Sequence, residues 1–270
     1  MNCQSYTYYL IDCINGSDSN DGIKKPFRTL DKALSVCNDS DLRLRFLSAG
    51  VYPTTAQHFS NLSMHWDGTS ADGDVIIDFV GNYPNKRIQF YNCYTHLKAV
   101  QIRWKPEDQL YFETGYCAIG DGSAFLSDVV RFNGMFMYAD TASFHRLIVR
   151  ESYTKLHNVS ITKPSDGNAI HSRDSFLTVY GTLTINPVAI SNEDSVIKAD
   201  RGRLYISTAP VSPTGYQYGI ACGNTELYIA QKYLDAFEKY TIKGNAITTP
   251  MSYKLSALEK RISEIEKRIF

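Results

Sequence analysis

A recurring apolar pattern marks the chain from residue 90 onward: two apolar residues stand seven positions apart, with mostly polar or small residues between them. Three copies align in register at residues 170–177, 197–204 and 220–227, and weaker copies lie at 90–97, 119–126 and 149–156. The first positions of the copies recur on average about every 26 residues, which is within the range of solenoid repeats. Short stretches of alternating apolar residues, bounded by Gly, Asn, Asp or Ser, fill each interval and are typical of strands. The pattern predicts an all-β fold, a parallel β-helix with one coil per repeat and its first apolar residues stacked along one wall.

An antiparallel β-sandwich is the competing interpretation, because it also consists of short strands separated by turns. The copies of the repeat, however, align along their apolar positions and not as mirrored hairpins. The high content of aromatic residues, with 19 Tyr and 13 Phe, suits strands in either architecture. The alignment therefore favours the β-helix, which we assign to residues 41–245.

The N-terminal segment, residues 1–40, has the pattern of a cap, which a solenoid needs because its first coil would otherwise expose apolar side chains and a sheet edge. Thr29 is suited to the N-cap of a short helix from Leu30 to Cys37. Leu30, Ala33, Leu34 and Cys37 share one face of that helix. The sequence thus predicts a cap with one helix ahead of the β-helix.

The C-terminal segment, residues 246–270, changes to a period of 3.5 and is expected to form a linker and an oligomerisation helix. Apolar residues occupy the a and d positions of this register: Met251, Leu255, Leu258, Ile262, Ile265 and Ile269. Opposite charges at g and e, such as Lys254 with Glu259, are expected between parallel neighbouring chains, and Ile at a and d favours three or more strands. A short C-terminal coiled coil in a parallel homotrimer is predicted; the alternative is an amphipathic helix folded back on its own domain.

The N-terminal region contains three notable segments: Tyr9–Asp12, the Gly/Asp/Asn-rich Asn15–Gly22, and Pro26–Leu34, followed by Gly50–Tyr52. These segments resemble the entry motif of pectate-lyase-like right-handed β-helix proteins, in particular bacteriophage tailspikes and tail fibres. The resemblance implies a right-handed β-helix whose end is plugged by the Thr-capped helix. It implies little about chemistry, because this fold carries lyases, hydrolases and inert fibres alike.

Charge and cysteine content narrow the range of partners. Lys+Arg and Asp+Glu both number 28, so the net charge of zero argues against a protein that coats nucleic acid or an anionic membrane. No apolar run approaches a membrane span and the N-terminus lacks a secretory signal, so we expect synthesis in a cytoplasm and no membrane insertion. Six cysteines without a C-x-x-C spacing are expected to be reduced thiols, and we expect no metal and no cofactor.

The acidic segment Asp18–Gly22 has two interpretations, a calcium loop or a hydrogen-bonded turn. In an EF-hand-like alignment that ends its first half at Gly22, Arg28 falls where the bidentate Glu belongs. The mismatch favours an Asx turn.

Catalytic candidates are restricted to carboxylates, since hydrolysis of a glycan needs two of them about 5–9.5 Å apart. The longest repeat intervals flank residue 119 and contain three weak candidates, Glu113, Asp121 and Asp128. The two tryptophans, Trp66 and Trp104, are candidates for stacking on sugar rings. No motif fixes an acid pair among them.

The resemblance implies a component of a phage virion, made in the host cytoplasm and located in the tail. We expect a non-enzymatic homotrimeric appendage that contacts the host surface, with a surface glycan as one candidate partner, or neighbouring tail and baseplate proteins. The alternative is a tailspike depolymerase that cleaves a host-surface polysaccharide. A free polysaccharide lyase fits less well, because such enzymes are commonly exported.

Overall fold

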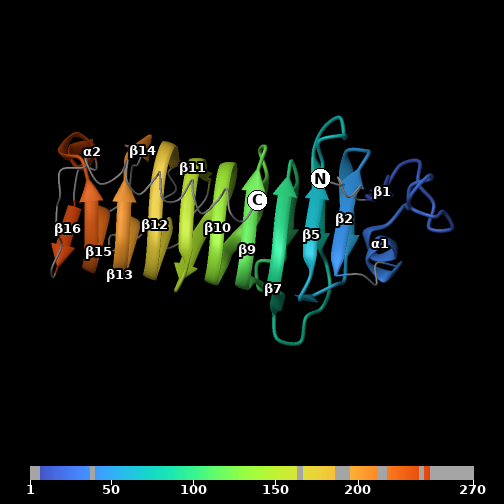
Figure 1. Ribbon diagram of the computed structural model, residues 1–270, viewed down its shortest axis with the longest axis horizontal. Coiled ribbons are helices and arrows are strands. Elements are labelled where there is room, and N and C mark those ends of the chain that lie inside the picture. The colour runs from blue at the N-terminus through green and yellow to red at the C-terminus, as the bar shows by residue number, and fades with distance from the viewer. Residues whose placement is uncertain are drawn as a thin grey trace, which may run out of the picture.

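The computed structural model describes residues 7–36, 40–162, 167–185, 195–208, 210–211, 218–236 and 240–243. They form a parallel β-solenoid, in which strands from successive parts of the chain lie side by side along one axis (Figure 1). The strands are β1 (Tyr9–Ile11), β2 (Asp41–Phe46), β3 (Gly50–Thr54), β4 (His58–Ser60), β5 (Ser63–Asp67), β6 (Val75–Phe79), β7 (Arg87–Lys98), β8 (Gln101–Trp104), β9 (Gln109–Gly120), β10 (Ala124–Arg150), β11 (Tyr153–Ile161), β12 (Ile170–Ile185), β13 (Ser195–Ile206), β14 (Pro210–Val211), β15 (Tyr218–Ile229) and β16 (Tyr240–Lys243). Two short helices, α1 (Leu30–Val36) and α2 (Gln231–Ala236), lie near the two ends. None of the described helices has the length and apolarity that crossing a membrane requires.

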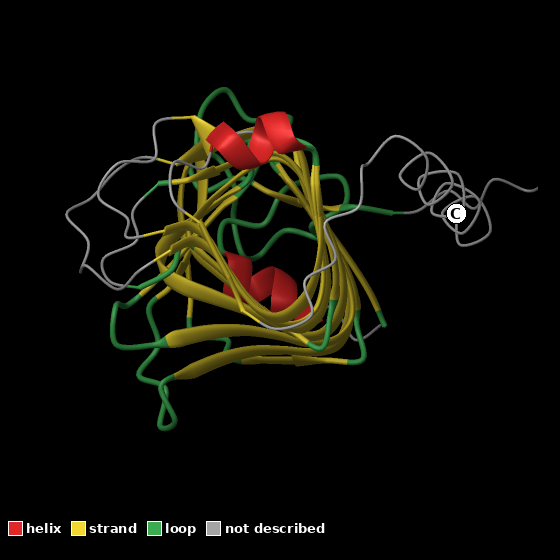
Figure 2. Ribbon diagram, turned by 90° about the vertical axis from the view of Figure 1, so that its left-hand side faces the viewer, coloured by secondary structure: helices red, strands yellow, loops and turns green. Residues whose placement is uncertain are grey.

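Bends in the longer strands divide the solenoid into three walls around one continuous core (Figure 2). Wall A consists of β1, β2 and β5 with residues 94–98, 116–120, 136–140, 153–157, 176–180, 203–206 and 226–229. Wall B consists of β4 and β16 with residues 87–91, 109–113, 130–133, 147–150, 170–173, 197–200 and 220–223. Wall C consists of β3, β6, β8 and β14 with residues 124–125, 142–144, 159–161 and 183–185.

The corner between wall B and wall A is built from residues with positive φ. Left-handed residues recur there in successive coils: Asn61, Asn92, Thr114, Gly134, Glu151, Asp174, Arg201 and Asn224. A left-handed backbone costs a non-glycine residue about 1–2 kcal/mol, so the corner depends on the contacts of its neighbours. Asn92 supplies one such contact, donating from Nδ2 to Oδ1 of Asn61 in the preceding coil at 2.7 Å. Gly202 follows the corner at φ 109°, where a Cβ would stand 2.2 Å from the carbonyl oxygen of Ser175, so only glycine fits.

The stacking predicted for the three strongest repeats is confirmed. Ile170 pairs with Ile197, and Ile197 with Ile220, all buried on the inner side of wall B. The three weaker copies do not join this stack as predicted. Phe90 lies two residues past the equivalent position on wall B, Ile119 lies on wall A, and Val149 pairs with Ser172.

The upstream error has a geometric cause. Inward side chains alternate along a wall, so Phe90 and Val149 lie on wall B but two residues past the equivalents of Ile170. The copy that begins at Ile119 instead spans the A–C corner. The seven-residue spacing alone therefore fixes neither the corner nor the position on a wall. The true equivalents of Ile170 stand four residues before the left-handed corner residue, at Ile88, Leu110, Val130 and Leu147. Successive coils therefore differ in length, and the coil from Val130 to Leu147 is much shorter than the mean interval that the sequence suggested.

Aromatic rings fill the core in its N-terminal and middle coils. Phe59, Phe90, Phe112 and Phe132 form one stack behind wall B, with centroid separations of 4.6, 4.6 and 4.9 Å. Burying a Phe side chain contributes about 1.5–3 kcal/mol, so this stack is a major part of the core. The cysteines within the described ranges, Cys13, Cys93, Cys117 and Cys222, are free thiols.

Helix α1 begins where the sequence places it. Thr29 Oγ1 accepts a hydrogen bond from the backbone N–H of Lys32 at 3.2 Å, which is the geometry of an N-cap. Leu30 and Ala33 are fully buried against the first coils. Viewed along the solenoid, α1 falls inside the outline of the strands at the N-terminal end (Figure 2).

The acidic loop before α1 is a set of hydrogen-bonded turns, as the mismatch with a calcium loop indicated. Asp21 Oδ1 accepts from the backbone N–H groups of residues 23, 24 and 25 at 2.9–3.0 Å, and these bonds lower the pKa of Asp21. Asp18 holds the start of the helix through the backbone N–H and hydroxyl of Thr29, at 2.9 and 2.8 Å. Both carboxylates are therefore used in shaping the chain.

The C-terminal heptad residues lie outside the described residues. The coiled coil and the boundary proposed near residue 245 stay predictions.

Candidate functional site

The two tryptophans lie in the core and not on a surface. Trp66 is 1% exposed and Trp104 is 2% exposed. Trp66 packs edge-on against Phe90 at 6.1 Å, and Trp104 packs edge-on against Phe125 at 6.5 Å. Because neither ring presents a face to solvent, neither can stack on a sugar in this conformation. The alternation of the strand could have predicted this burial: Met64 and Trp66 point inward, whereas His65 and Asp67 point outward.

Glu113 lies on the outer side of wall B, in a polar network. Its Oε2 accepts hydrogen bonds from Arg87 Nη2 and from Gln89 Nε2, and its Oε1 accepts from Asn133 Nδ2 at 3.4 Å. The side chain is 20% exposed. Both carboxylate oxygens thus accept hydrogen bonds from the two neighbouring coils. Glu113 therefore helps to hold these coils together.

Asp121 and Asp128 lie far from Glu113 along the coil. Asp121 is a left-handed residue at the A–C corner, 58% exposed at its side chain and 3.2 Å from Lys98 Nζ. Asp128 is half-buried at the bend from wall C to wall B. Wall A separates Glu113 from Asp121, and its five-residue strand alone spans about 16 Å at about 3.3 Å per residue. The structure therefore does not bring this pair to the separation of about 5–9.5 Å that glycan hydrolysis requires.

A shallow hollow of about 240 Å³ lies beside wall C and is lined by residues of two loops, including Lys86, Lys105, Glu107 and Asp108. Asp108 is 6% exposed, and burial together with the charge of Glu107 raises its pKa. Lys105 Nζ closes one side, donating to Gly81 O at 3.0 Å and to Asn82 Oδ1 at 2.8 Å. A raised pKa alone does not make a catalytic acid, and the described lining of this hollow includes no carboxylate besides the adjacent Glu107 and Asp108.

Asp78, an outward carboxylate on wall C, is also engaged. Arg103 donates to it through Nε at 3.0 Å and through Nη2 at 2.6 Å. A bidentate arginine holds the carboxylate in one orientation. Both oxygens of Asp78 are therefore engaged by the neighbouring coil.

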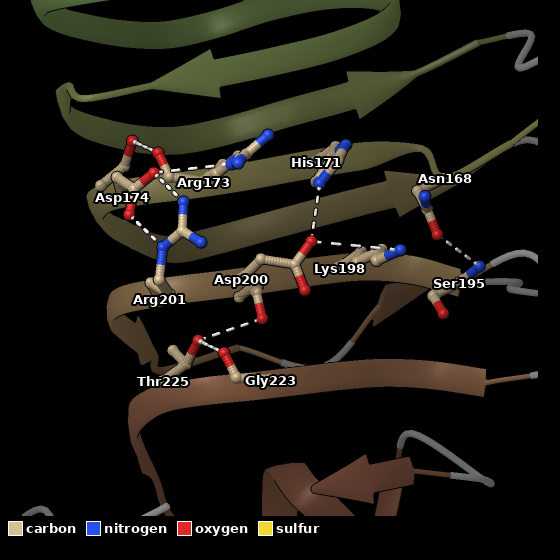
Figure 3. Close-up of polar contacts among 12 residues, drawn as sticks. Asn168, His171, Arg173, Asp174, Ser195, Lys198, Asp200, Arg201, Gly223 and Thr225 are labelled. Atoms are coloured by element: carbon tan, nitrogen blue, oxygen red, sulfur yellow. Dashed lines mark hydrogen bonds and ion pairs between the residues drawn. The ribbon is translucent and has the colours of Figure 1, made fainter. Parts of the chain in front are cut away.

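Ion pairs cover the outer side of wall B in its C-terminal coils (Figure 3). His171 Nε2 lies 3.0 Å from Asp200 Oδ2 in the next coil. Arg201 donates to both oxygens of Asp174, through Nε at 2.5 Å and Nη2 at 2.6 Å, which bridges two successive corner residues. Burial lowers the pKa of His171 although Asp200 opposes that change. Each of these groups pairs with a neighbouring coil, which stabilises the stacking of coils.

The outer side of wall A carries stacked aromatic side chains in addition to ion pairs such as Arg203 with Glu226. Rings from successive coils stack face to face: Tyr94 with Tyr116 at 4.8 Å, His157 with Tyr180 at 4.4 Å, Tyr153 with Phe176 at 4.9 Å, Phe176 with Tyr205 at 4.9 Å, and Tyr205 with Tyr228 at 4.3 Å. We call these side chains, with Phe136, the aromatic ladder. Phe136 stands 6.0 Å from Tyr153 and is 61% exposed. The ladder was not among the sequence-based candidates and is the most extensive organised feature of the described outer surface.

Among the residues that the structure describes, no three His, Cys, Asp or Glu side chains group as metal ligands. The described outer surface carries stacked rings and ion pairs, and Glu113, Asp121 and Asp128 lie apart on it. Comparison of the chain with protein-family models, with curated proteins and with solved structures finds no match.

Proposed function

We propose that this protein is a non-enzymatic, homotrimeric appendage of a bacteriophage tail, which contacts the host surface or neighbouring tail proteins. The observation that carries the non-enzymatic part is the dispersal of the carboxylates: Glu113, Asp121 and Asp128 lie at different corners and walls, and Glu113 is saturated by its neighbours. A rigid rod of stacked coils suits a protein that spans a distance and presents a surface.

The assignment to a phage tail rests on the resemblance of residues 9–34 and 50–52 to the entry motif of tailspikes and tail fibres. The N-cap at Thr29 and the burial of Leu30 and Ala33 support a plug of the kind that this motif implies. A right-handed winding and an end cap are part of the same proposal. The heptads from Met251 to Ile269 support assembly as three parallel chains.

Two measurements test the proposal. Static light scattering of the purified protein should give the mass of three chains, and Ile262→Lys with Ile265→Lys should reduce it, because burying like charges in one seam is unfavourable. Incubation with a panel of purified capsular polysaccharides and lipopolysaccharide O-chains should leave their size distribution unchanged. A wild-type monomer at micromolar concentration contradicts the assembly, and shortened glycans contradict the non-enzymatic role in favour of a depolymerase.

Host contact needs a separate measurement. Retention of the intact protein on bacterial envelopes, with an equal amount of unrelated trimeric protein as the control, should be saturable if the appendage contacts the cell directly. Retention on purified tail proteins without envelope binding would instead indicate a role as an adaptor inside the tail.

A further inference from the structure

The rings of the aromatic ladder cover one another's faces, and Tyr205, stacked between Phe176 and Tyr228, is only 4% exposed. Neighbouring rings are nearly parallel, with interplanar angles of 14° for Tyr94 on Tyr116 and 3° for Tyr205 on Tyr228. Centroid separations of 4.3–4.9 Å match the spacing of about 4.7–4.9 Å between strands, so each ring covers the face of the next. Sugar rings dock on open aromatic faces. A stack that already covers its own faces is poorly suited to bind a glycan in this way.

Rows of ring edges are suited to packing against other side chains, because aromatic pairs also favour edge-to-face contacts. The exposed centre of the ladder is Phe136, which stands in the middle coil of wall A. Protein–protein interfaces have such an anatomy, an aromatic centre with few charges.

The charges of wall A are neutralised locally. Arg43 pairs with Asp41 at 2.8 Å, Arg45 with Asp67 at 3.6 Å, and Arg203 with Glu226 at 2.7 Å. In the middle coils, Asp140 lies 3.0 Å from His157, and Lys155 Nζ stands over the rings of Tyr138 and Tyr180 at 5.6 and 5.2 Å. When two copies pack in parallel with the same coils side by side, each positive side chain lies near a negative or polar one of its own chain. Repulsion between like charges of the two copies is therefore small.

The size of wall A sets how much of it each neighbour covers. Ten strands at about 4.8 Å make the wall about 43 Å long, and five residues at about 3.3 Å make it about 16 Å wide. The resulting area of about 700 Å² per chain is divided between two neighbours around a threefold axis, about 350 Å² for each, whereas a partner in a standard interface buries roughly 800 Å². Wall A is therefore expected to act together with the C-terminal heptads in assembly.

We infer that wall A, centred on Phe136, is the surface through which copies of this chain pack in parallel and at equal height around a common axis. The inference rests on the self-association proposed above and names the face that performs it. In this arrangement the ring edges of the copies interdigitate along the axis, and the charged pairs at both ends of the wall form a polar rim.

The test replaces Phe136 with Asp and compares it with a matched variant on another wall. Tyr91 is the control, because it is an aromatic residue of wall B with 45% exposure. Phe136→Asp should raise the dissociation constant of the oligomer at least about 100-fold in sedimentation equilibrium, since removal of a central aromatic anchor has an effect of that size. Tyr91→Asp should leave the oligomer intact. Far-UV circular dichroism of both variants reports whether the solenoid is folded.

A second measurement does not depend on a destabilising charge. Phe136→Cys, treated with a short bis-maleimide, should form cross-linked chains above the background of the wild-type cysteines, and Tyr91→Cys should not. Cross-links from Tyr91→Cys alone would overturn the inference.

Other outcomes are equally decisive. A wild-type monomer overturns both the inference and the proposed trimer. An oligomer that survives Phe136→Asp but dissociates with Ile262→Lys and Ile265→Lys overturns the inference only. An unchanged oligomer in which Phe136→Asp abolishes retention on purified O-chains also overturns it, and would show that wall A binds glycan.

Discussion

Wall A and wall B are parallel sheets formed by the same coils, but they differ in their outward-facing side chains. On wall B, charged groups bond across coils, as Arg201 does with Asp174 and Arg87 with Glu113. On wall A, rings also stack across coils, as Tyr205 does on Tyr228, beside ion pairs such as Arg203 with Glu226. The spacing of about 4.8 Å between strands suits both a stacked ring pair and an ion pair, so the backbone does not decide between them. The fold therefore sets the spacing between neighbouring coils, whereas the outward-facing residues determine what each wall can bind.

The inner sides of the two walls give the largest expected difference. Phe112→Ala on wall B removes a ring from the middle of the core stack and should lower the free energy of unfolding by about 3–5 kcal/mol. Cys117→Ala, in the same strand but behind wall A, removes one fully buried atom and should cost about 1–2 kcal/mol. Urea unfolding followed by circular dichroism measures both. Equal losses would contradict the view that the Phe stack behind wall B is a major part of the core.

The corner that joins the two walls gives the next effect. Gly202→Ala meets both a φ of 109° and the carbonyl oxygen of Ser175 at 2.2 Å, so we expect a loss of about 2–4 kcal/mol. Gly122→Ala is the matched control, because its φ is 79° but no heavy atom lies within 4 Å of the added Cβ. The control should lose about 1 kcal/mol, the cost of the left-handed backbone alone. Equal losses of unfolding free energy in the two variants would show that the close approach of the coils at Gly202 does not add to the cost of the substitution.

Much of this architecture is readable from the sequence, and the missed parts have physical reasons. The stack of Ile170, Ile197 and Ile220 is predictable because three equal copies define one corner. The upstream coils are not, because alternating inward residues on wall B allow a shift of two residues and the same spacing also occurs across the A–C corner. Outward positions require the correct register first: Tyr205 and Tyr228 occupy the same place in two aligned copies, yet their stacking follows only once the strands are known to be adjacent. Contacts between coils, such as the hydrogen bonds to Glu113, join residues that are 20 to 26 positions apart, so they can be identified only once the strand register is known.

A pH effect of intermediate size is expected from wall A. Burial, with the charges of Arg43 and His96, lowers the pKa of His65 from 6.5 to about 4, although Asp41 opposes this. The unfolded chain therefore binds more protons than the folded chain between these values, so this contribution to stability is complete above about pH 6.5 and falls as the pH decreases toward 4. The shift corresponds to at most about 3 kcal/mol, and screening at a half-buried site reduces it to about 1–2 kcal/mol.

The measurement is the free energy of unfolding at intervals between pH 7 and pH 4. His65→Gln should flatten the curve, while His58→Gln, at an exposed position on wall B, should leave it unchanged. An equally steep curve in His65→Gln would show that another group, with His96 the first candidate because burial also lowers its pKa, produces the pH dependence.

The smallest expected effect concerns the best-placed carboxylate of wall B. Glu113→Gln keeps the shape of the side chain, but only one of its two terminal atoms is still an acceptor. If the amide oxygen accepts from Arg87 and Gln89, the NH₂ group faces the Nδ2 donor of Asn133, and the negative charge beside Arg87 is lost. We expect a loss of about 1 kcal/mol in stability, since the side chain is partly exposed. Asp121→Asn, at a more exposed position, should change stability by less than about 0.5 kcal/mol. Neither variant should alter the oligomer or the size of any incubated polysaccharide, because both carboxylates serve neighbouring coils. Should wild-type protein shorten a glycan and Glu113→Gln reduce that rate by about 100-fold, the size expected for loss of a proton donor or acceptor, wall B would have to be reassigned as a catalytic surface.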